Sequence, residues 1–273
     1  MHRILIFLVG MIPNFLCTEK ARATPIPAPC YVYLTLDDGP LKGSDTLIQL
    51  TKTMALPISF MWVGKHIEAH QNLLKNMDFK ADEDLIFIGN HSYSHGKNQY
   101  KTFYADPEQV VQDFNQNELL LDELISRKTT KLARLPGYNI WQIGGRFRYV
   151  KQYAGKAAKQ LSNQGYSLIG WDVEWEKNPK NGKPRQSVLE VVKAIEMAQK
   201  TAFTPGHVVV LAHDTMFKDT DALQELVLLL REKGYCLQNI TAYPGIKKND
   251  EEADSSLESI EEPPTHHRTS PIL

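Results

Sequence analysis

Two adjacent carboxylates, Asp37 and Asp38, end a run of β-favouring residues that begins at Tyr31 and is closed by Gly39-Pro40. Val, Tyr, Thr and Leu in succession are typical of a buried strand, and Gly-Pro marks a turn. Adjacent carboxylates repel each other unless a cation or a proton relieves the repulsion. We therefore expect one of them to bind a metal and the other to act as a base; the alternative is a solvated turn.

Two histidines, His91 and His95, follow the apolar run Leu85–Ile88. Their four-residue spacing lets one helical turn place both imidazoles on the same side. With one carboxylate they form a set of ligands that leaves positions open for water or substrate, which suits zinc first and also admits cobalt, nickel or iron. The alternative interpretation is a polar turn on the surface.

Three further polar segments follow apolar runs: Arg134, the segment 171–175, and His213. A bound divalent ion lowers the pKa of its water, a carboxylate can take the proton, and a separate imidazole can protonate a leaving amine. This combination predicts amide or ester hydrolysis. Each residue also has a plain structural interpretation, because an arginine often forms a surface ion pair and a histidine can be a satisfied core residue.

Two more roles follow for these segments. Arg134 would keep Asp37 ionised so that it works as a base. Trp175 and Leu211 can form the wall of a small apolar pocket for an acyl group, although Trp175 also fits an ordinary core position.

The apolar runs predict seven strands, each followed by a helix or a long crossover, and therefore a parallel sheet with helices outside it, closed into a barrel or left open. All the polar segments named above follow the carboxyl ends of strands, where parallel α/β folds form active sites. About 220 residues serve this unit, which is close to the size of a (β/α) barrel, so we expect one domain over residues 24–246. The expected strands are 31–36, 58–63, 85–88, a short one around 132, 168–170, 208–211 and 235–240.

Composition sets limits on partners. The chain has 273 residues, 42% hydrophobic and 23% charged, as in an ordinary globular protein. Because 31 basic residues balance 32 acidic ones, no strong field favours nucleic acid or a polyanionic substrate. No protein partner is indicated.

The first 23 residues have the pattern of a secretory signal peptide: a basic start, an apolar run over 4–16, and the small-x-small site Ala21-Arg-Ala23. About a dozen apolar residues are too few to span a membrane, so we expect no stable span after cleavage and a secreted or periplasmic protein. An uncleaved anchor and a lipoprotein site at Cys17 are the alternatives. At the other end, residues 247–273 are predicted to be a disordered acidic tail, in which His266-His267 is solvated.

Removal of the leader leaves two cysteines, Cys30 before the first strand and Cys236 at the start of the last one. We predict a disulfide between them, with two separate buried thiols as the alternative. The HxExH pattern formed by His66, Glu68 and His70 places the glutamate on another face of a helix, so we interpret it as solvated helix surface rather than a zinc site.

The whole set of motifs resembles the polysaccharide deacetylases with the NodB homology domain, carbohydrate esterase family 4, over residues 31 to 245. The five motifs occur in the family's order. Thr35-Leu-Asp-Asp-Gly-Pro40 is similar to TFDDGP, His91-Ser-Tyr-Ser-His95 to H[ST]xxH, Arg134-Leu-Pro136 to RxP, Trp171–Trp175 to the DxxDW region, and Leu211-Ala-His213 to LxH.

The resemblance implies a distorted (β/α) barrel of about seven parallel strands and the removal of acetyl groups from N-acetylated sugars. It implies Asp37 as base and His213 as acid. It also implies the following binding residues: the metal ligands Asp38, His91 and His95, and the acetate pocket Trp175 and Leu211.

Two departures from the family pattern matter. Gly137 precedes Tyr138 where the family often has Pro-Tyr, which leaves open the backbone N–H that supports the oxyanion. Glu174 stands beside Trp175 where an aspartate is usual, so either Asp172 or Glu174 would tune His213.

The sequence therefore predicts a metal-dependent deacetylase, most simply a zinc enzyme. Its substrate would be a glycan that contains N-acetylglucosamine: peptidoglycan, a chitooligosaccharide or an exopolysaccharide. An O-acetyl esterase or small-amide hydrolase on the same scaffold is the alternative within enzymes, and a weakly active glycan-binding protein is the alternative outside them.

Overall fold

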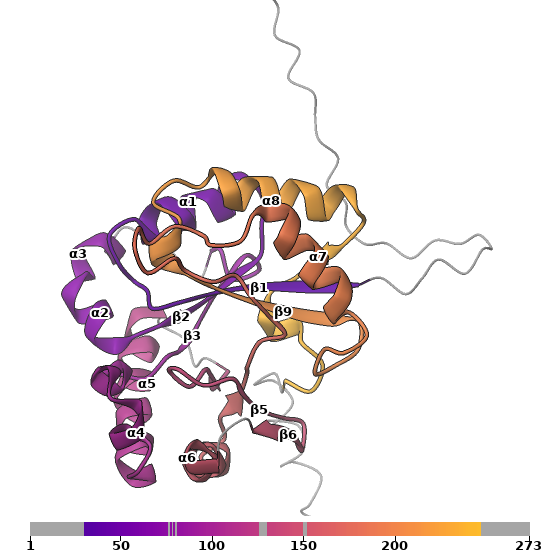
Figure 1. Ribbon diagram of the computed structural model, residues 1–273. Coiled ribbons are helices and arrows are strands. Elements are labelled where there is room, and N and C mark those ends of the chain that lie inside the picture. Colours follow the sequence, from indigo (N-terminus) through magenta and orange to yellow (C-terminus); the bar gives the residue numbers. More distant parts are fainter. Residues whose placement is uncertain are drawn as a thin grey trace, which may run out of the picture.

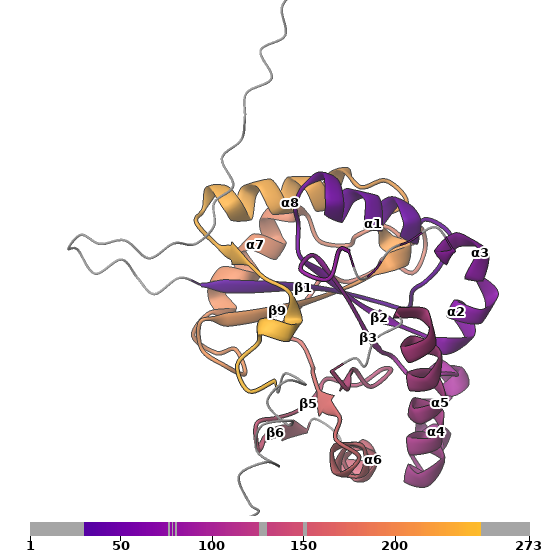
Figure 2. The same cartoon turned by 180° about the vertical axis from the view of Figure 1, so that it is seen from behind.

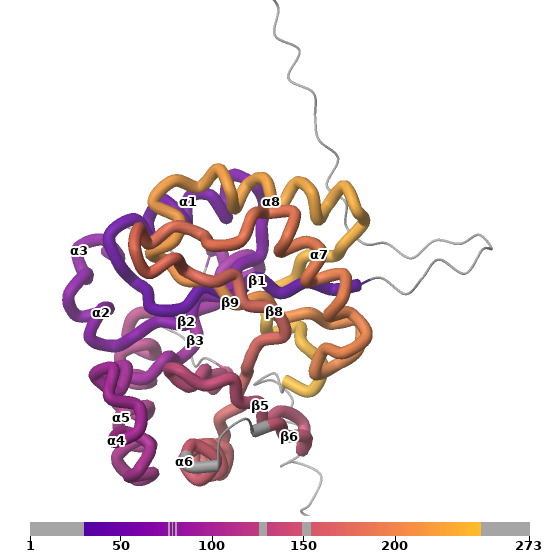
Figure 3. The backbone as a smooth tube through the Cα atoms, viewed as in Figure 1, coloured from indigo at the N-terminus to yellow at the C-terminus, as the bar shows by residue number. Residues whose placement is uncertain are grey.

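A computed structural model describes residues 30–75, 77, 79, 81–125, 130–149 and 152–246. The predicted signal peptide and acidic tail lie outside the described residues. Within them, no helix is both long and apolar enough to cross a membrane. Figure 1 shows a curved sheet with helices packed outside it, and Figure 3 follows the same chain as a tube.

The described part of the chain contains one ten-stranded sheet in the order β6-β5-β7-β4-β3-β2-β1-β9-β8, with β10 paired to the start of β1. Eight of the strands take part in parallel pairs, so the predicted parallel sheet is confirmed. These strands are β1 (Tyr31–Asp37), β2 (Ile58–Trp62), β3 (Ile86–Asn90), β4 (Leu132–Ala133), β7 (Ser167–Leu168), β8 (Val173–Glu174), β9 (His207–His213) and β10 (Cys236–Leu237).

The sheet curls into a distorted half-barrel, and its path ends at β6 and β8, which do not pair with each other in the described residues. In Figure 1, α1, α7 and α8 lie together along the upper side, α2 to α5 lie at the left and α6 lies below; Figure 2 shows the same arrangement from behind. The helices are α1 (Ser44–Thr53), α2 (Gly64–Ala69), α3 (Gln71–Leu74), α4 (Tyr100–Phe103), α5 (Pro107–Ile125), α6 (Gln152–Asn163), α7 (Val188–Ala198) and α8 (Asp221–Glu232), with short 3₁₀ turns at His95–Asn98, Asp214–Met216 and Ile240–Ala242.

An antiparallel hairpin was not expected from the sequence. Strands β5 (Ile140–Ile143) and β6 (Arg146–Tyr149) pair with each other, and β5 joins β7. Gly144 and Gly145 form the two-residue turn with φ of 57° and 75°, which favours glycine because two-residue hairpin turns require positive φ. Tyr149 is the last residue of the hairpin, and helix α6 begins at Gln152.

Alternation along the strands divides the side chains between two packed layers. Val32, Leu34 and Leu36 of β1 pack outward in the largest apolar cluster, together with residues of α1, α7 and α8. Tyr33 faces inward, where it packs with residues such as Val209 of β9. The inner face therefore continues from an apolar cluster at the start of the strands to polar side chains at their carboxyl ends.

The predicted disulfide between Cys30 and Cys236 is not formed in the structure. The register explains this, because Cys236 pairs with Tyr31, the residue after Cys30. Neighbouring residues of a strand point to opposite faces, and Cys30 packs against the outer cluster whereas Tyr31 packs against the inner one. The two thiol groups are thus directed to opposite sides of the sheet, and burial raises the pKa of Cys30 to about 11.

Candidate active site

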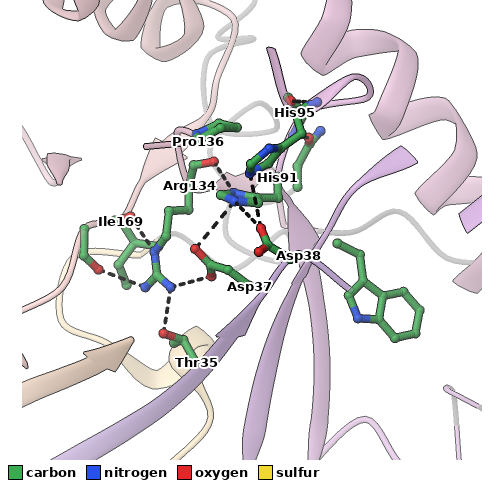
Figure 4. Close-up of polar contacts among 12 residues, drawn as sticks. Thr35, Asp37, Asp38, His91, His95, Arg134, Pro136 and Ile169 are labelled. Atoms are coloured by element: carbon green, nitrogen blue, oxygen red, sulfur yellow. Dashed lines mark hydrogen bonds and ion pairs between the residues drawn. The ribbon is translucent and has the colours of Figure 1, made fainter. Parts of the chain in front are cut away.

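Three side chains from two strand ends form the one group of possible metal ligands found in the described residues: Asp38, His91 and His95. Their ligand atoms all lie within 4.8 Å of one another. Asp38 Oδ1 is 3.2 Å from His95 Nε2 and 3.7 Å from His91 Nε2. Figure 4 shows the two imidazoles and the Asp38 carboxylate turned toward one another.

The second ring nitrogen of each histidine, Nδ1, lies within hydrogen-bonding distance of an acceptor oxygen. His91 Nδ1 lies 2.9 Å from the Arg134 carbonyl oxygen, and His95 Nδ1 lies 3.0 Å from Asn98 Oδ1. These acceptors place the proton on Nδ1 and leave the Nε2 lone pairs directed at Asp38. Two imidazole nitrogens and one carboxylate with open positions suit zinc, so the residues present fit the metal that the sequence predicts.

Charge and burial act in opposite directions on these ligands. Burial lowers the pKa of His91, which favours the neutral imidazole that a metal needs. Burial also lowers the pKa of His95, but the hydrogen bond to Asp38 outweighs it and the pKa is raised overall. At Asp38 burial acts to raise the pKa, yet the contacts with His95, His91 and His213 hold it well below its usual range.

The HxxxH segment is a strained loop and not the helical turn that we predicted. Ser92 and His95 have φ of 65° and 52°, and Asn98 has φ of 58°. Asp113 of α5 stabilises this loop because its Oδ1 accepts hydrogen bonds from the backbone N–H groups of residues 93 and 94, at 2.9 and 3.0 Å. Left-handed non-glycine residues cost free energy and persist where tertiary contacts hold them, as they do here at a candidate site.

Asp38 also has a left-handed backbone, with φ of 74°. Its carbonyl oxygen lies 2.6 Å from His66 Nδ1, so His66 is half-buried support for this turn and not the solvated surface that we predicted. Gly39 follows in a space with no room for a side chain, since a Cβ there would collide with the Asp214 carboxylate and the Trp62 indole.

Asp37 lies beside the candidate metal ligands in a buried ion pair. Arg134 Nη1 donates to Asp37 Oδ1 at 2.7 Å and to Thr35 Oγ1 at 2.7 Å. The same guanidinium donates to the carbonyl oxygens of Ile169 and Gly170, so it is fixed on both sides (Figure 4). The other Asp37 oxygen, Oδ2, is 3.6 Å from His91 Nε2, so the carboxylate lies next to the three candidate ligands.

His213 stands opposite Asp37 in the β1–β9 register. Its Nδ1 is buried without a hydrogen-bond partner in the described part of the chain, so no carboxylate contacts the imidazole there. The next residue, Asp214, is buried and accepts a hydrogen bond from Ser44 Oγ at 2.6 Å. Burial, together with the charges of Asp38 and Asp37, raises the pKa of Asp214 to about 8 against the lowering effect of the Ser44 hydrogen bond.

These side chains meet in a pocket of about 400 Å³ at the carboxyl ends of the strands. Of the residues predicted from the sequence, Glu174 and Leu211 line it, and Asp172, Trp175 and Tyr138 do not. The complete lining is Asp37, Asp38, His91, His95, Asn98, Tyr100, Leu135, Gly137, Trp171, Glu174, Lys177, Leu211 and His213.

Trp175, predicted to wall the acyl pocket, lies in the core instead. It is 1% exposed, packs edge-on against Phe217, and donates from Nε1 to the Gln186 carbonyl at 3.0 Å. Trp171, for which no role was predicted, lines the pocket and lies 5.9 Å from the Arg134 guanidinium.

Asp172, one of the two candidates to tune His213, has structural partners. Its carboxylate accepts from the backbone N–H groups of Phe203 and Val209 at 2.8 and 3.0 Å and from Arg148 at 3.3 Å. Burial raises its pKa against these contacts. Glu174 is exposed at the pocket, so of the two candidates it is the one placed near the site.

Tyr138 is nearly buried and packs edge-on against Tyr100 and Tyr104. Its backbone N–H donates to the Leu135 carbonyl at 3.3 Å, within the turn that Gly137 makes at φ of 74°. The pocket is therefore lined by Gly137 rather than by the Tyr138 ring.

Five pocket residues were not predicted from the sequence: Asn98, Tyr100, Leu135, Trp171 and Lys177. Leu135 and Trp171 lie inside motifs that the sequence analysis names, so their positions offered a signal. Asn98 and Lys177 lie in loops, and only the folded loops bring them to the site.

Comparisons with known proteins show which family the chain resembles. The family model of polysaccharide deacetylases matches residues 26–158. A chitin disaccharide deacetylase of Vibrio alginolyticus is 22% identical over 306 residues, covering 78% of this chain and 71% of that protein. Matches to the curated relatives cover between 26% and 71% of those proteins, so several of them extend well beyond the matched region.

Solved structures show the same fold. The catalytic domain of a peptidoglycan N-acetylglucosamine deacetylase from Eubacterium rectale matches with a TM-score of 0.61 at 20% identity, over 84% of this chain and 96% of that one. A family 4 pseudoenzyme from Bacillus anthracis matches with a TM-score of 0.54 at 19% identity, over 79% and 65%. The half-barrel with histidines and aspartates at its strand ends is a NodB-type fold, and the chain belongs to the polysaccharide deacetylase family.

Proposed function

We propose that this protein hydrolyses acetamido groups on a glycan that contains N-acetylglucosamine, releases acetate, and requires a divalent metal, most simply zinc. One observation carries the proposal. A buried carboxylate, Asp37, lies 3.6 Å from one member of a set of three converging metal ligands, in a pocket that also receives an imidazole from the neighbouring strand.

The reaction needs a base, an acid and a polarised carbonyl. Asp37 takes the proton from the attacking water, whose oxygen adds to the acetyl carbon, and Arg134 fixes the carboxylate through the 2.7 Å ion pair. His213 gives a proton to the nitrogen as the C–N bond breaks, which yields acetate and a free amine. Zinc held by Asp38, His91 and His95 would act as a Lewis acid and lower the pKa of the water.

Apolar contacts in the pocket suit the acetyl methyl group. Leu211 and Trp171 both line it, and they come from β9 and from the segment just before β8. A wall of this kind accepts a methyl group while the polar side faces the scissile bond. Glu174, exposed at the same pocket, is the residue that we assign to tuning His213 or the leaving amine.

The substrate class rests on the relatives. A chitin disaccharide deacetylase and a peptidoglycan-N-acetylglucosamine deacetylase are among them, and both names specify acetylated amino sugars. Peptidoglycan, chitooligosaccharides and acetylated exopolysaccharides are therefore the substrates that we propose, in the secreted or periplasmic location that the amino-terminal sequence predicts.

An O-acetyl esterase and a binding protein are the competing functions. One structural relative is a pseudoenzyme, so the fold alone does not require turnover. This chain holds a base, an acid and three ligands in one pocket, and a glycan-binding protein needs none of these together. The set therefore favours catalysis.

Acetate release tests the proposal. Purified protein lacking residues 1–23 is loaded with zinc or cobalt and incubated with chitotetraose, peptidoglycan and an O-acetylated xylan. We expect acetate from an N-acetylated substrate, at least a ~1,000-fold loss in Asp37→Asn, and loss of both activity and zinc in His91→Ala. The control His70→Ala, at a half-buried position directly after α2 and outside the pocket, should behave as wild type. Zinc binding without acetate from any N-acetylated glycan contradicts the deacetylase proposal.

A further inference from the structure

Lys177 occupies a position that the reaction described above does not use. Its side chain lines the active-site pocket, and it is the one lysine or arginine among the lining residues described. The ammonium nitrogen lies 4.0 Å from Asp38 Oδ2 and 3.3 Å from Thr215 Oγ1. An ammonium group has three N–H donors, so these two contacts leave at least one for a molecule in the pocket.

Asp38 presents its two oxygens to different neighbours. Oδ1 faces His91 and His95, whereas Oδ2 faces Lys177. The ammonium thus lies on the open side of the ligand set, next to the space where an acetyl group would bind. It is 35% exposed at its side chain, which leaves it accessible from the pocket.

The loop that carries Lys177 is ordered by its own contacts. Lys177 forms a β-bridge with Pro184, and the backbone N–H of Asn178 donates to the Lys183 carbonyl at 2.8 Å. Below it, Arg185 and Glu176 are joined by an ion pair of 2.6 Å and by a backbone hydrogen bond of 2.8 Å. The loop therefore fixes the base of the Lys177 side chain before any substrate binds.

A backbone amide next to the pocket lining offers a weaker donor. The Tyr138 N–H, which follows Gly137, donates to the Leu135 carbonyl inside its own turn. This amide is committed to the loop, whereas the Lys177 ammonium is charged and faces the pocket.

We propose that Lys177 is a further catalytic residue, whose ammonium group stabilises the negative charge that develops on the acetyl carbonyl oxygen during hydrolysis. This inference rests on the proposed function. The substrate amide is neutral and the transition state is anionic at that oxygen, so a fixed cation binds the transition state more strongly than the substrate. Removal of the charge should lower kcat and leave KM nearly unchanged.

Kinetics with matched variants test the proposal. Lys177→Met is compared with Lys180→Met, which removes an exposed lysine of the same loop outside the pocket. Using zinc-loaded protein and chitotetraose, we expect a loss of about 100-fold in kcat for Lys177→Met, a KM within about threefold of wild type, and no change for Lys180→Met. Lys177→Arg keeps the charge and should recover at least ~10-fold of the loss.

Two binding measurements separate this role from others. A chitotetraose analogue that carries a methylphosphonamide in place of one acetamide is a tetrahedral anion, and its affinity should fall in Lys177→Met by about as much as kcat. Zinc affinity, measured by calorimetry, should not weaken. Loss of zinc would mean that Lys177 only positions Asp38, which overturns the proposal.

The remaining outcomes of these experiments also test the proposed role of Lys177. If Lys177→Met stays within threefold of Lys180→Met in kcat and in analogue affinity, the proposed role of Lys177 is wrong. The deacetylase function would be unaffected by that result. If KM rises only for peptidoglycan and not for chitotetraose, Lys177 binds a carboxylate of the substrate. That result would also overturn the proposed role. If wild type releases no acetate, the function proposed above fails, and analogue binding in the two variants still tests the charge of Lys177.

Discussion

The active-site pocket has a floor and a rim that are built in different ways. The floor consists of Asp37 and His91, together with Arg134, which pairs with Asp37 but lies outside the pocket lining. These three side chains are at most 4% exposed and come from the ends of strands or directly after them. The rim consists of Asn98, Trp171 and Lys177, which come from loops. Floor residues are held by backbone carbonyls and by one another, whereas the rim residues depend on the fold of each loop.

The difference between floor and rim shows which pocket residues are fixed by the sheet and which can be changed through a single loop. The strands fix the floor because alternate residues on the inner face of β1 and β9 lead directly to it: Tyr33, Thr35 and Asp37 on one strand, and Leu211 and His213 on the other. A rim residue can be exchanged by altering one loop. We therefore expect floor substitutions to affect stability and chemistry together, and rim substitutions to affect binding or rate alone.

The largest effect is expected from Arg134→Met. This change removes the counter-charge of the buried Asp37, and leaving a buried charge unpaired costs about 3–5 kcal/mol. Urea unfolding at pH 7 should show that loss, and acetate release should fall more than ~100-fold. Arg185→Met, which breaks the exposed pair with Glu176, is the control and should change the free energy of unfolding by less than ~1 kcal/mol. Equal costs for the two variants would remove the distinction between floor and surface.

A rim substitution, Asn98→Gly, should act on the metal without unfolding the protein. Glycine suits the left-handed backbone at this position but removes the oxygen that orients His95. Loss of such a supporting contact typically weakens metal binding about 10–100-fold. Competition with a zinc chelator measures it, and Asn98→Asp, which restores an acceptor, should recover the affinity. Wild-type affinity in Asn98→Gly would show that His95 needs no support.

The two tryptophans sharpen the comparison further. Trp171 lines the pocket and Trp175 lies in the core, so Trp171→Ala should lower kcat/KM about 10-fold for an N-acetylated substrate, whereas Trp175→Phe should change it less than threefold. Acetate release measured across substrate concentrations gives kcat/KM for both variants. The reverse ranking would restore Trp175 as the wall of the acyl pocket, as the sequence predicts.

The effect of Asp214 is expected to appear through pH rather than through activity. Burial raises its pKa to about 8 from an ordinary 3.8, so between these values the folded state holds a proton that the unfolded state has lost. The stability from this proton is present below pH 4 and is lost as pH rises toward 8. The free energy of unfolding of Asp214→Asn should therefore gain on wild type by roughly 1 kcal/mol per pH unit between pH 5 and 8, as urea titrations measure. A difference that does not vary with pH would show that Asp214 is ionised throughout.

Residue types and spacing were enough to predict the floor. Val, Leu and Tyr in alternation fixed β1 and its inward face, and a carboxylate or imidazole after such a run must emerge at the edge where parallel strands end. The motif order added the family, which the comparisons confirm. Strand ends and their polar residues are local properties, so a sequence contains them.

Loop conformation and long-range register were decided only by the tertiary structure. The HxxxH turn is left-handed because Asp113 of a distant helix holds it, and Cys236 points away from Cys30 because it pairs with the next residue. Lys177 and Trp171 reach the pocket because β8 joins β9 in a particular register, Glu174 opposite Leu211. These features depend on contacts between residues far apart in the chain, and no local pattern of side chains encodes them.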